Sequence, residues 1–369
     1  MDKERIKLVN RFGKFSPKLS TRNDLITYAL VIVVFVMIQI ISASGGLSNL
    51  WQGLLVPLCT YVILAVSLNL TVGILGELSL GHAGFMCIGA FTGAFFSLLM
   101  ENTISSAWIR FPLALLLGGL SAAFFGAVIG VTVLRLRGDY LAIVTLAFGE
   151  IIKNVVNVLY VGKDSSGLHI SASSMAALNM KAGGEILING PQGISGTPMD
   201  ANFTIGIILI LITLFVTINL IHSRTGRAIM AIRDNRIAAE SLGINITRYK
   251  LIAFTISAFF AGIAGVLYAH NLSTLTALPK NFGYNMSIII LVFVVLGGIG
   301  NIRGSIIAAV VLTALPEILR ELNDYRMLIY AIVLILMMLF TSSPKAIAFR
   351  ERYSIRRLLD RIRTHKEAG

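Results

Sequence analysis

The sequence predicts an all-α polytopic membrane protein, a helical bundle of about eight to ten transmembrane helices. Its 369 residues are 56% hydrophobic and only 13% charged, with a mean hydropathy of +0.82. Soluble domains carry about 25% charged residues, so charge is depleted roughly twofold here. Several apolar runs reach the roughly 20 residues that a helix needs to cross a bilayer. These runs are solid rather than alternating, which disfavours membrane-spanning strands.

Cations concentrate in three segments that lie beside apolar runs. Of the 31 lysines and arginines, seven lie in residues 1–23, six in 224–250 and eight in 345–369. Cytoplasmic segments of membrane proteins retain cations in this way next to anionic lipid. We therefore attribute the net charge of +13 to membrane topology, and expect a lipid bilayer but no nucleic acid as a partner.

This pattern divides the chain into three parts. A cytoplasmic basic arm (1–23) precedes a transmembrane domain (24–343) that contains a polar loop (224–250), and a cytoplasmic basic tail (344–369) follows. The arm leads into a full-length span, Leu25 to Ala43, without the short apolar core of a cleavable signal peptide.

About ten crossings place every dense cation cluster, and both termini, on the cytoplasmic side. Four crossings return the chain inside at Arg135 and Arg137, two more at the polar loop and four more at the tail. Residues 286–296 and 305–319 are each short for a span, so eight crossings with a re-entrant pair satisfy the same parity. The longest polar connection, residues 161–202, carries few cations and is expected outside.

The polar loop carries the signals of a short helix. Asp234 or Asn235 can cap a helix start, and Gly243 fits the position just past a helix end. Ala238 and Ala239 between them are small and allow a partner surface to approach closely. We hypothesise a cytoplasmic coupling helix that docks onto another protein. The alternative is an ordinary basic loop that only sets the topology.

A glycine-rich break with a charged residue lies between two apolar runs, in GILGELSLGHAGFMCIGAFTGA (73–94). Glycines let the backbone leave helical geometry and expose N–H or C=O groups to a ligand. Four residues of this break are candidates for a substrate path: Glu77, Ser79, Gly81 and His82. The alternative is close helix packing through small residues, which explains most of these glycines: Gly81, Gly84, Gly89 and Gly93.

The fifth predicted span contains polar residues at helical spacing. Glu150 and Lys153 are three residues apart, share a helix face and can form an ion pair. One interpretation is that Glu150, Asn154 and Asn157 line the transport path, because intramembrane charges face a bundle interior or an aqueous cavity. The other is that this end of the span lies at the interface, with Lys153 reaching the aqueous boundary.

The sequence contains no catalytic pattern. Five histidines are scattered without an H-x-x-x-H pair, and no G-x-x-x-x-G-K-[ST] phosphate loop occurs. We therefore expect a transport subunit rather than an enzyme, with no cofactor and no metal. Cys59 and Cys87 lie in apolar runs and are expected to be small buried residues rather than a disulfide.

Four stretches resemble the permease subunits of ATP-binding-cassette (ABC) importers for branched-chain amino acids, and within that family the LivM-type subunit. The pattern Ala238-Ala239-x-x-x-Gly243 is similar to the coupling motif of importer permeases, whose loop fits a cleft in the ATPase. The wider motif has glutamate before the two alanines, where this sequence has Ile237, so a salt bridge from that position has no counterpart here. The four stretches are, in order, residues 69–94, 137–157, 231–269 and 297–309.

The resemblance implies a permease in a bacterial inner membrane that two cytoplasmic ATP-binding subunits drive. It also implies a second homologous permease subunit and an extracytoplasmic substrate-binding protein. The coupling residues that it implies are Arg233, Asp234, Asn235, Ala238, Ala239, Glu240 and Gly243.

The substrate that the resemblance implies is leucine, isoleucine or valine, a zwitterion with an apolar side chain. Its carboxylate would suit free N–H groups at a helix start. Two rivals stay open. One is an ABC permease for urea or short amides. The other is an ion-coupled secondary amino-acid transporter with Glu77 or Glu150 as the coupling carboxylate.

Overall fold

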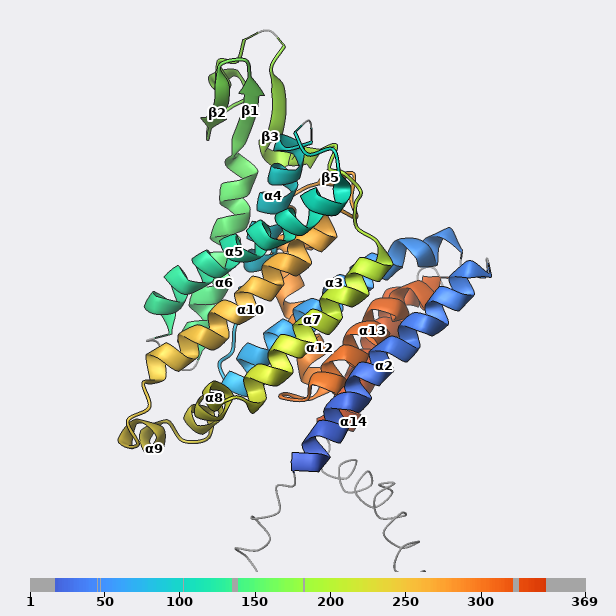
Figure 1. Cartoon of the computed structure of the whole chain (residues 1–369), viewed down its shortest axis with the longest axis vertical. Coiled ribbons are helices and arrows are strands. Elements are labelled where there is room, and N and C mark those ends of the chain that lie inside the picture. The colour runs from blue at the N-terminus through green and yellow to red at the C-terminus, as the bar shows by residue number, and fades with distance from the viewer. Residues whose placement is uncertain are drawn as a thin grey trace, which may run out of the picture.

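A computed structural model describes residues 17–44, 46, 48–101, 103–134, 139–181, 183–320 and 325–342. Most of the basic arm, the whole basic tail and the predicted cytoplasmic turn at Arg135 and Arg137 lie outside these residues. The chain forms an elongated helical bundle with a small sheet at one end (Figure 1). Its helices are α2 (Pro17–Ala43), α3 (Asn49–Asn69), α4 (His82–Leu99), α5 (Ala107–Val133), α6 (Asp139–Val158), α7 (Phe203–His222), α8 (Arg224–Asp234), α9 (Arg236–Ser241), α10 (Ile246–Ala269), α11 (Pro279–Phe282), α12 (Tyr284–Gly297), α13 (Ile302–Ile318) and α14 (Arg326–Ser342).

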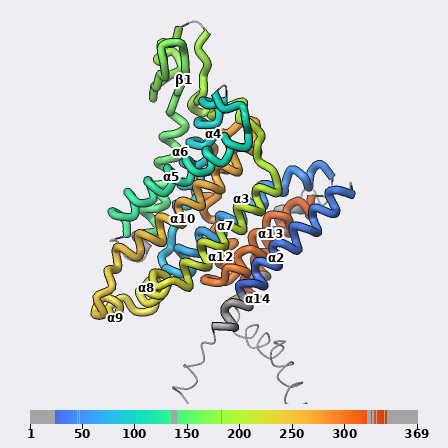
Figure 2. Tube along the Cα trace, in the orientation of Figure 1, coloured from blue at the N-terminus to red at the C-terminus, as the bar shows by residue number. Residues whose placement is uncertain are grey.

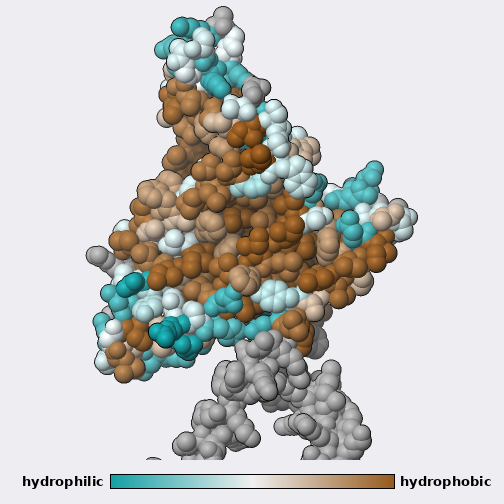
Figure 3. Space-filling view, in the orientation of Figure 1, coloured by the Kyte–Doolittle hydropathy of each residue, from teal (hydrophilic) through white to brown (hydrophobic). Residues whose placement is uncertain are grey.

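Eight helical segments among the described residues are long and apolar enough to cross a membrane. Two further apolar helices, α13 and α14, have 17 residues each and would bring the number to ten. Figure 3 shows an apolar belt across the middle of the molecule, with hydrophilic surface over the sheet at one end and over α8 and α9 at the other. The predicted fold class is confirmed, and the expected range of eight to ten spans contains both numbers.

Glycines bring α4, α5 and α10 into backbone contact at the centre of the bundle. A Cβ atom at Gly89 of α4 would lie 2.2 Å from the carbonyl oxygen of Gly262 in α10. A Cβ atom at Gly262 would in turn lie 2.6 Å from the carbonyl oxygen of Gly118 in α5. Only glycine leaves room for backbones this close, and each contact gains dispersion energy along the crossing.

The packing interpretation of the α4 glycines is confirmed by their surroundings. Gly81 and Gly84 face α6, where added Cβ atoms would lie 2.2 Å from the Thr145 carbonyl oxygen and 2.7 Å from the Gly149 Cα atom. Gly89 and Gly93 face α10. The two cysteines, Cys59 and Cys87, are free and buried, as expected.

The connection expected as a polar loop outside folds into a sheet. Strands β1 (Tyr160–Asp164), β2 (Gly167–Ser171) and β3 (Glu185–Asn189) pair in the antiparallel order β2-β1-β3. Two short strands, β4 (Ile194–Ser195) and β5 (Thr274–Leu275), join this connection to the segment after α10. Asp164 holds the β1–β2 turn by accepting hydrogen bonds from Ser166 and from the backbone N–H of Lys181, and these bonds lower the pKa of its carboxyl group.

One helix of the bundle, α4, begins inside it rather than at its surface. α3 ends in a π-helical turn, η1 (Leu70–Leu75), and Gly76 follows with a φ of 79°. The chain then runs without helical structure to His82, where α4 begins. Leu80 donates its backbone N–H to Thr145 Oγ1 (3.1 Å), which belongs to the interior of α6, so this break lies at the depth of the spans.

Candidate functional site

The end of the molecule opposite the sheet is built by α8 and α9, which occupy the predicted coupling loop (Figure 2). Asn235 is the N-cap of α9, and its Oδ1 accepts the Ala238 N–H at 3.0 Å. Gly243 follows the last turn with a φ of 78°, a left-handed conformation that L side chains rarely adopt, and donates to the Glu240 carbonyl oxygen. The short predicted helix and its end are confirmed. The sequence did not predict that α8 precedes it.

The two alanines of the predicted coupling motif point in different directions. Ala238 is exposed, whereas Ala239 is buried in a small core with Ile232 of α8 and Ile246 of α10. The large apolar side chains exposed on α9 and its end are Ile237, 78% exposed, and Leu242, 80% exposed. An exposed apolar pair at a helical tip suits a protein docking surface. At position 237, the exposed side chain is therefore apolar where the wider motif has a glutamate.

Arg233, at the end of α8, connects this tip to the π-helical turn. Its Nη1 donates to the Gly73 carbonyl oxygen in η1 at 3.1 Å, while Nε and Nη2 bind Asp234 at 3.1 and 2.9 Å. The side chain passes so close to Gly76 that a Cβ atom there would lie 2.6 Å from its Cγ. Asp234 therefore orients this arginine instead of capping α9.

Apolar packing supports the same connection. Ile229 of α8 is fully buried with Leu70, Ile74 and Leu75 of η1 and with Ala253 of α10. α8 therefore contacts η1 through close-packed side chains as well as through a hydrogen bond. Because close-packed groups compress little, a movement of α8 would displace η1 as well.

Glu77 forms an ion pair with Lys250 at the beginning of α10. The Glu77 and Lys250 side chains are 15% and 5% exposed, so each charge is largely removed from water and is stabilised by the opposite charge of its partner. This contact ties the break that precedes α4 to the same helix that follows α9. The sequence marked Glu77 as part of a substrate path, and the structure gives it an ion-pair partner far away in the chain.

Replacing Glu77 by glutamine is expected to destabilise the chain by about 3–5 kcal/mol, because Lys250 would stay buried without a countercharge. Thermal melts in detergent measure the effect. The double variant Glu77→Gln, Lys250→Met is expected to regain most of the loss. The control is Glu317→Gln, which breaks an exposed ion pair with Arg320 and should cost less than about 1 kcal/mol. Equal melting temperatures for Glu77→Gln and the wild type would show that the stability of the chain does not depend on this ion pair.

The α12–α13 turn holds the opposite side of η1. Asn69 accepts the Gly300 N–H at 2.9 Å and donates to Ser305 Oγ at 2.9 Å. Gly73 has no room for a side chain, since a Cβ atom would lie 2.4 Å from the Gly300 nitrogen. η1 is therefore held by α8, α10 and α13 together.

A cluster of buried polar side chains surrounds the start of α4. His82, 2% exposed, places Nε2 at 2.8 Å from Ser67 Oγ, and Ser287 of α12 accepts the Ala83 N–H at 3.0 Å. Ser79, 1% exposed, has no hydrogen-bond partner for its hydroxyl group. We call Ser67, Ser79, His82, Thr145 and Ser287 the buried polar cluster. It connects the start of α4 to α3 and to α12 inside the bundle.

α6 supports the start of α12 from the side. Glu150 forms the predicted ion pair with Lys153, and its other oxygen accepts the Tyr284 N–H at 2.7 Å. Asn157 donates to the Ala277 carbonyl oxygen at 3.0 Å. Asn154 is exposed on the outer face of α6 and does not join these contacts. The structure therefore brings Ser79, Gly81 and His82 together and separates Asn154 from them.

Several contacts at the site were not predicted. Ser67, Ser287 and the contact between Arg233 and Gly73 were missed, because serines in apolar runs and carbonyl oxygens carry no pattern of their own. A weak signal existed for Lys250, since a cation at the start of a span needs a partner or an aqueous boundary. Among the residues that the structure describes, no group of three or more His, Cys, Asp or Glu side chains could hold a metal ion.

Long apolar helices, interrupted at membrane depth around buried polar groups and carrying a helical tip at one end, define a polytopic membrane permease. The family profile described as "Branched-chain amino acid transport system / permease component" matches residues 51–340, and the chain belongs to this family.

Individual relatives agree with the family. The chain is 39% identical to the high-affinity branched-chain amino acid transport system permease protein LivM of Salmonella typhimurium over 289 residues, 76% of this chain and 66% of that protein. For LivM of Escherichia coli the identity is 38% over the same shares. LivH of Salmonella typhimurium is 25% identical over 69% of this chain and 79% of its own length. The chain spans just under two thirds of the LivM proteins, and no solved structure gives a significant match.

Proposed function

We propose that this chain is the transmembrane permease subunit of an ABC importer that moves leucine, isoleucine or valine into the cell. The observation that carries the proposal is the capped helix α9, which presents an exposed apolar tip and is linked through Arg233 to the interrupted start of α4. The family and the names of the LivM and LivH relatives support the substrate class.

The proposed assembly has the partners that such an importer requires. Two cytoplasmic ATP-binding subunits dock at α9, and an extracytoplasmic binding protein delivers substrate at the sheet end. A second homologous permease subunit completes the path, and similarity to both LivM and LivH supports such a pair. The chain lies in the inner membrane, with α8 and α9 and both termini on the cytoplasmic side, where the cation clusters belong.

Movement of the ATPases is transmitted to the substrate path through η1. Closure of the ATPases moves α9, and α8 follows because Ala239 packs against Ile232. Arg233 and Ile229 carry this movement to η1, and the break that follows η1 leads directly to His82. The buried polar cluster therefore opens and closes with the ATPases.

The path residues that we propose are Ser79, Gly81 and His82, with Glu77 and Glu150 supporting them and Asn154 apart from them on the outer face of α6. Ser79 has an unpaired buried hydroxyl group, and the start of α4 suits the carboxylate of an amino acid. Glu77 and Glu150 hold the chain around the cluster through their ion pairs. Asn154, a polar group on an exposed helix face, suits a hydrogen bond to the second permease.

Reconstitution into proteoliposomes tests the function. Vesicles that contain the chain, its proposed permease partner and the two ATPases are expected to transport labelled leucine under two conditions only. ATP must be present on the side of the ATPases, and the binding protein on the opposite side. Uptake that follows a proton or sodium gradient without the ATPases would instead establish the secondary transporter. Uptake of urea but not of leucine would establish the amide permease.

A further inference from the structure

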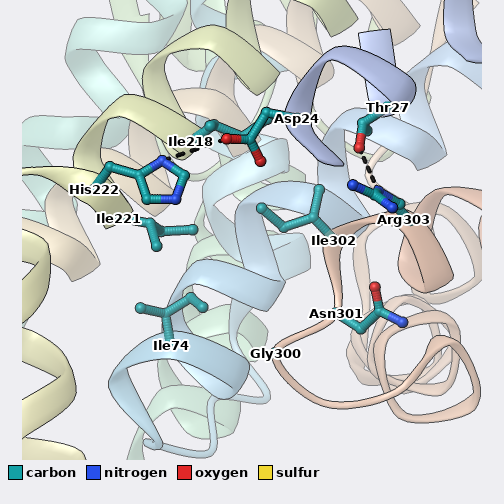
Figure 4. A pocket seen from close by; sticks show the side chains of 10 residues that line it. All are labelled: Asp24, Thr27, Ile74, Ile218, Ile221, His222, Gly300, Asn301, Ile302 and Arg303. Atoms are coloured by element: carbon teal, nitrogen blue, oxygen red, sulfur yellow. Dashed lines mark hydrogen bonds and ion pairs between the residues drawn. The ribbon is translucent and has the colours of Figure 1, made fainter. Parts of the chain in front are cut away.

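A polar pocket of about 330 Å³ lies at one end of the seam between α2, α7 and α13. Figure 4 shows Asp24 and Thr27 of α2 on one side of it, His222 of α7 on another and Arg303 of α13 facing them. Asp24 lies 3.7 Å from His222 Nδ1, and Arg303 Nε donates to Thr27 Oγ1 at 2.6 Å. Four isoleucines form the remaining apolar wall.

A second cavity, of about 270 Å³, lies further along the same seam, and all of its lining side chains are apolar. Leu30 and Val31 line it one helical turn beyond Thr27, and Ile306 and Ile307 line it one turn beyond Arg303. The polar pocket and this apolar groove therefore stack end to end along α2 and α13.

The groove lies at the depth of the spans and opens to the outside of the bundle. Only 11% of the α2 span is buried, and Val34 and Ile307, which line the groove, are 39% and 46% exposed. In a bilayer, a cavity of this composition excludes water and takes up an acyl chain. The charged pocket at its end then meets the head-group layer.

The charged side chains of the pocket, Asp24 and Arg303, indicate which lipid head group it would bind. A phosphate suits Arg303, because guanidinium binds phosphate through directed charge-assisted hydrogen bonds. The carboxylate of Asp24 suits a primary ammonium group, which donates N–H bonds that a choline group lacks. A head group without a cation, such as that of phosphatidylglycerol, would place its hydroxyl groups and its negative phosphate near Asp24 and would leave the Asp24 carboxylate without a countercharge from the lipid.

We propose that the seam between α2, α7 and α13 is a binding site for one molecule of phosphatidylethanolamine. Its phosphate lies at Arg303, its ammonium group at Asp24 and one acyl chain in the apolar groove. Only 11% of the described α2 span is buried, and a lipid along the seam would add contacts that fasten this span to the bundle. The site is independent of the transported substrate.

Native mass spectrometry of the delipidated full-length chain tests the proposal with added phosphatidylethanolamine, phosphatidylglycerol and leucine. The wild type is expected to retain one phosphatidylethanolamine and to prefer it over phosphatidylglycerol. Arg303→Gln should weaken retention about tenfold. Ile307→Trp, which fills the groove from an exposed position, should abolish the single-lipid adduct. The matched control is Arg320→Gln, which removes an exposed cation just beyond the end of α13 and should change nothing.

The most specific variant is Asp24→Asn. It is expected to bind phosphatidylglycerol as well as phosphatidylethanolamine, a change of preference that misfolding does not produce. The proposal is overturned if the wild type retains both lipids equally, or if Arg303→Gln and Arg320→Gln behave alike. Displacement of the lipid by leucine would overturn it in favour of a site for the free amino acid.

Discussion

If the proposed importer is reconstituted, replacing Gly243 by valine is expected to abolish its ATP-driven leucine uptake while the chain still inserts and folds. Gly243 has a φ of 78°, and a β-branched residue in this conformation costs about 1–2 kcal/mol or more. α9 has only six residues and cannot absorb that strain. The turn that presents Ile237 and Leu242 would be lost, and with it the docking that we propose for the ATPases.

Two controls separate this effect from general damage. Gly243→Asn should retain most of the uptake, because asparagine tolerates the left-handed conformation. Gly196→Val introduces the same strain at a φ of 78°, with open space around the added side chain, but at the sheet end of the molecule. It should leave co-purification of the ATPases unchanged. Co-purification and uptake at wild-type levels by Gly243→Val would contradict the proposed role of α9.

Replacing Gly262 by leucine is expected to prevent the central bundle from forming. A Cβ atom there would lie 2.5 Å from Ala122 Cβ and 2.6 Å from the Gly118 carbonyl oxygen. A backbone oxygen cannot move aside as a flexible side chain does, so α10 must separate from α5. The expected loss is at least about 3 kcal/mol, seen as a large fall in melting temperature and as aggregation during size-exclusion chromatography.

Gly53 of α3 provides the matched control for this prediction. It is also a helical glycine, but among the described residues no atom outside the adjoining backbone of α3 lies within 4 Å of an added Cβ. Gly53→Leu should therefore melt at or above the wild-type temperature, since leucine favours helix more than glycine does. Similar melting of the Gly262 and Gly53 variants would show that the close crossing does not hold the bundle together.

Local sequence patterns were sufficient to predict features that depend only on residues close together in the chain. Gly243 and one of the two predicted caps, Asn235 rather than Asp234, bound α9 in the structure, because capping depends on residues a few positions apart. The Glu150–Lys153 ion pair followed from helical spacing alone. The β1–β3 sheet was not predicted, because its strands have five residues each and gain stability only from pairing across the connection.

The sequence by itself determined that this protein is a helical membrane protein with one polar segment, residues 224–250, between its apolar helices. Composition and run length decide whether a helix can lie in hydrocarbon, and both are local quantities. Only the tertiary structure decided which polar groups meet, such as Glu77 with Lys250 and Asn69 with Ser305. Those partners are far apart in the chain, and a buried polar group accepts whichever partner the packing of the helices brings within reach.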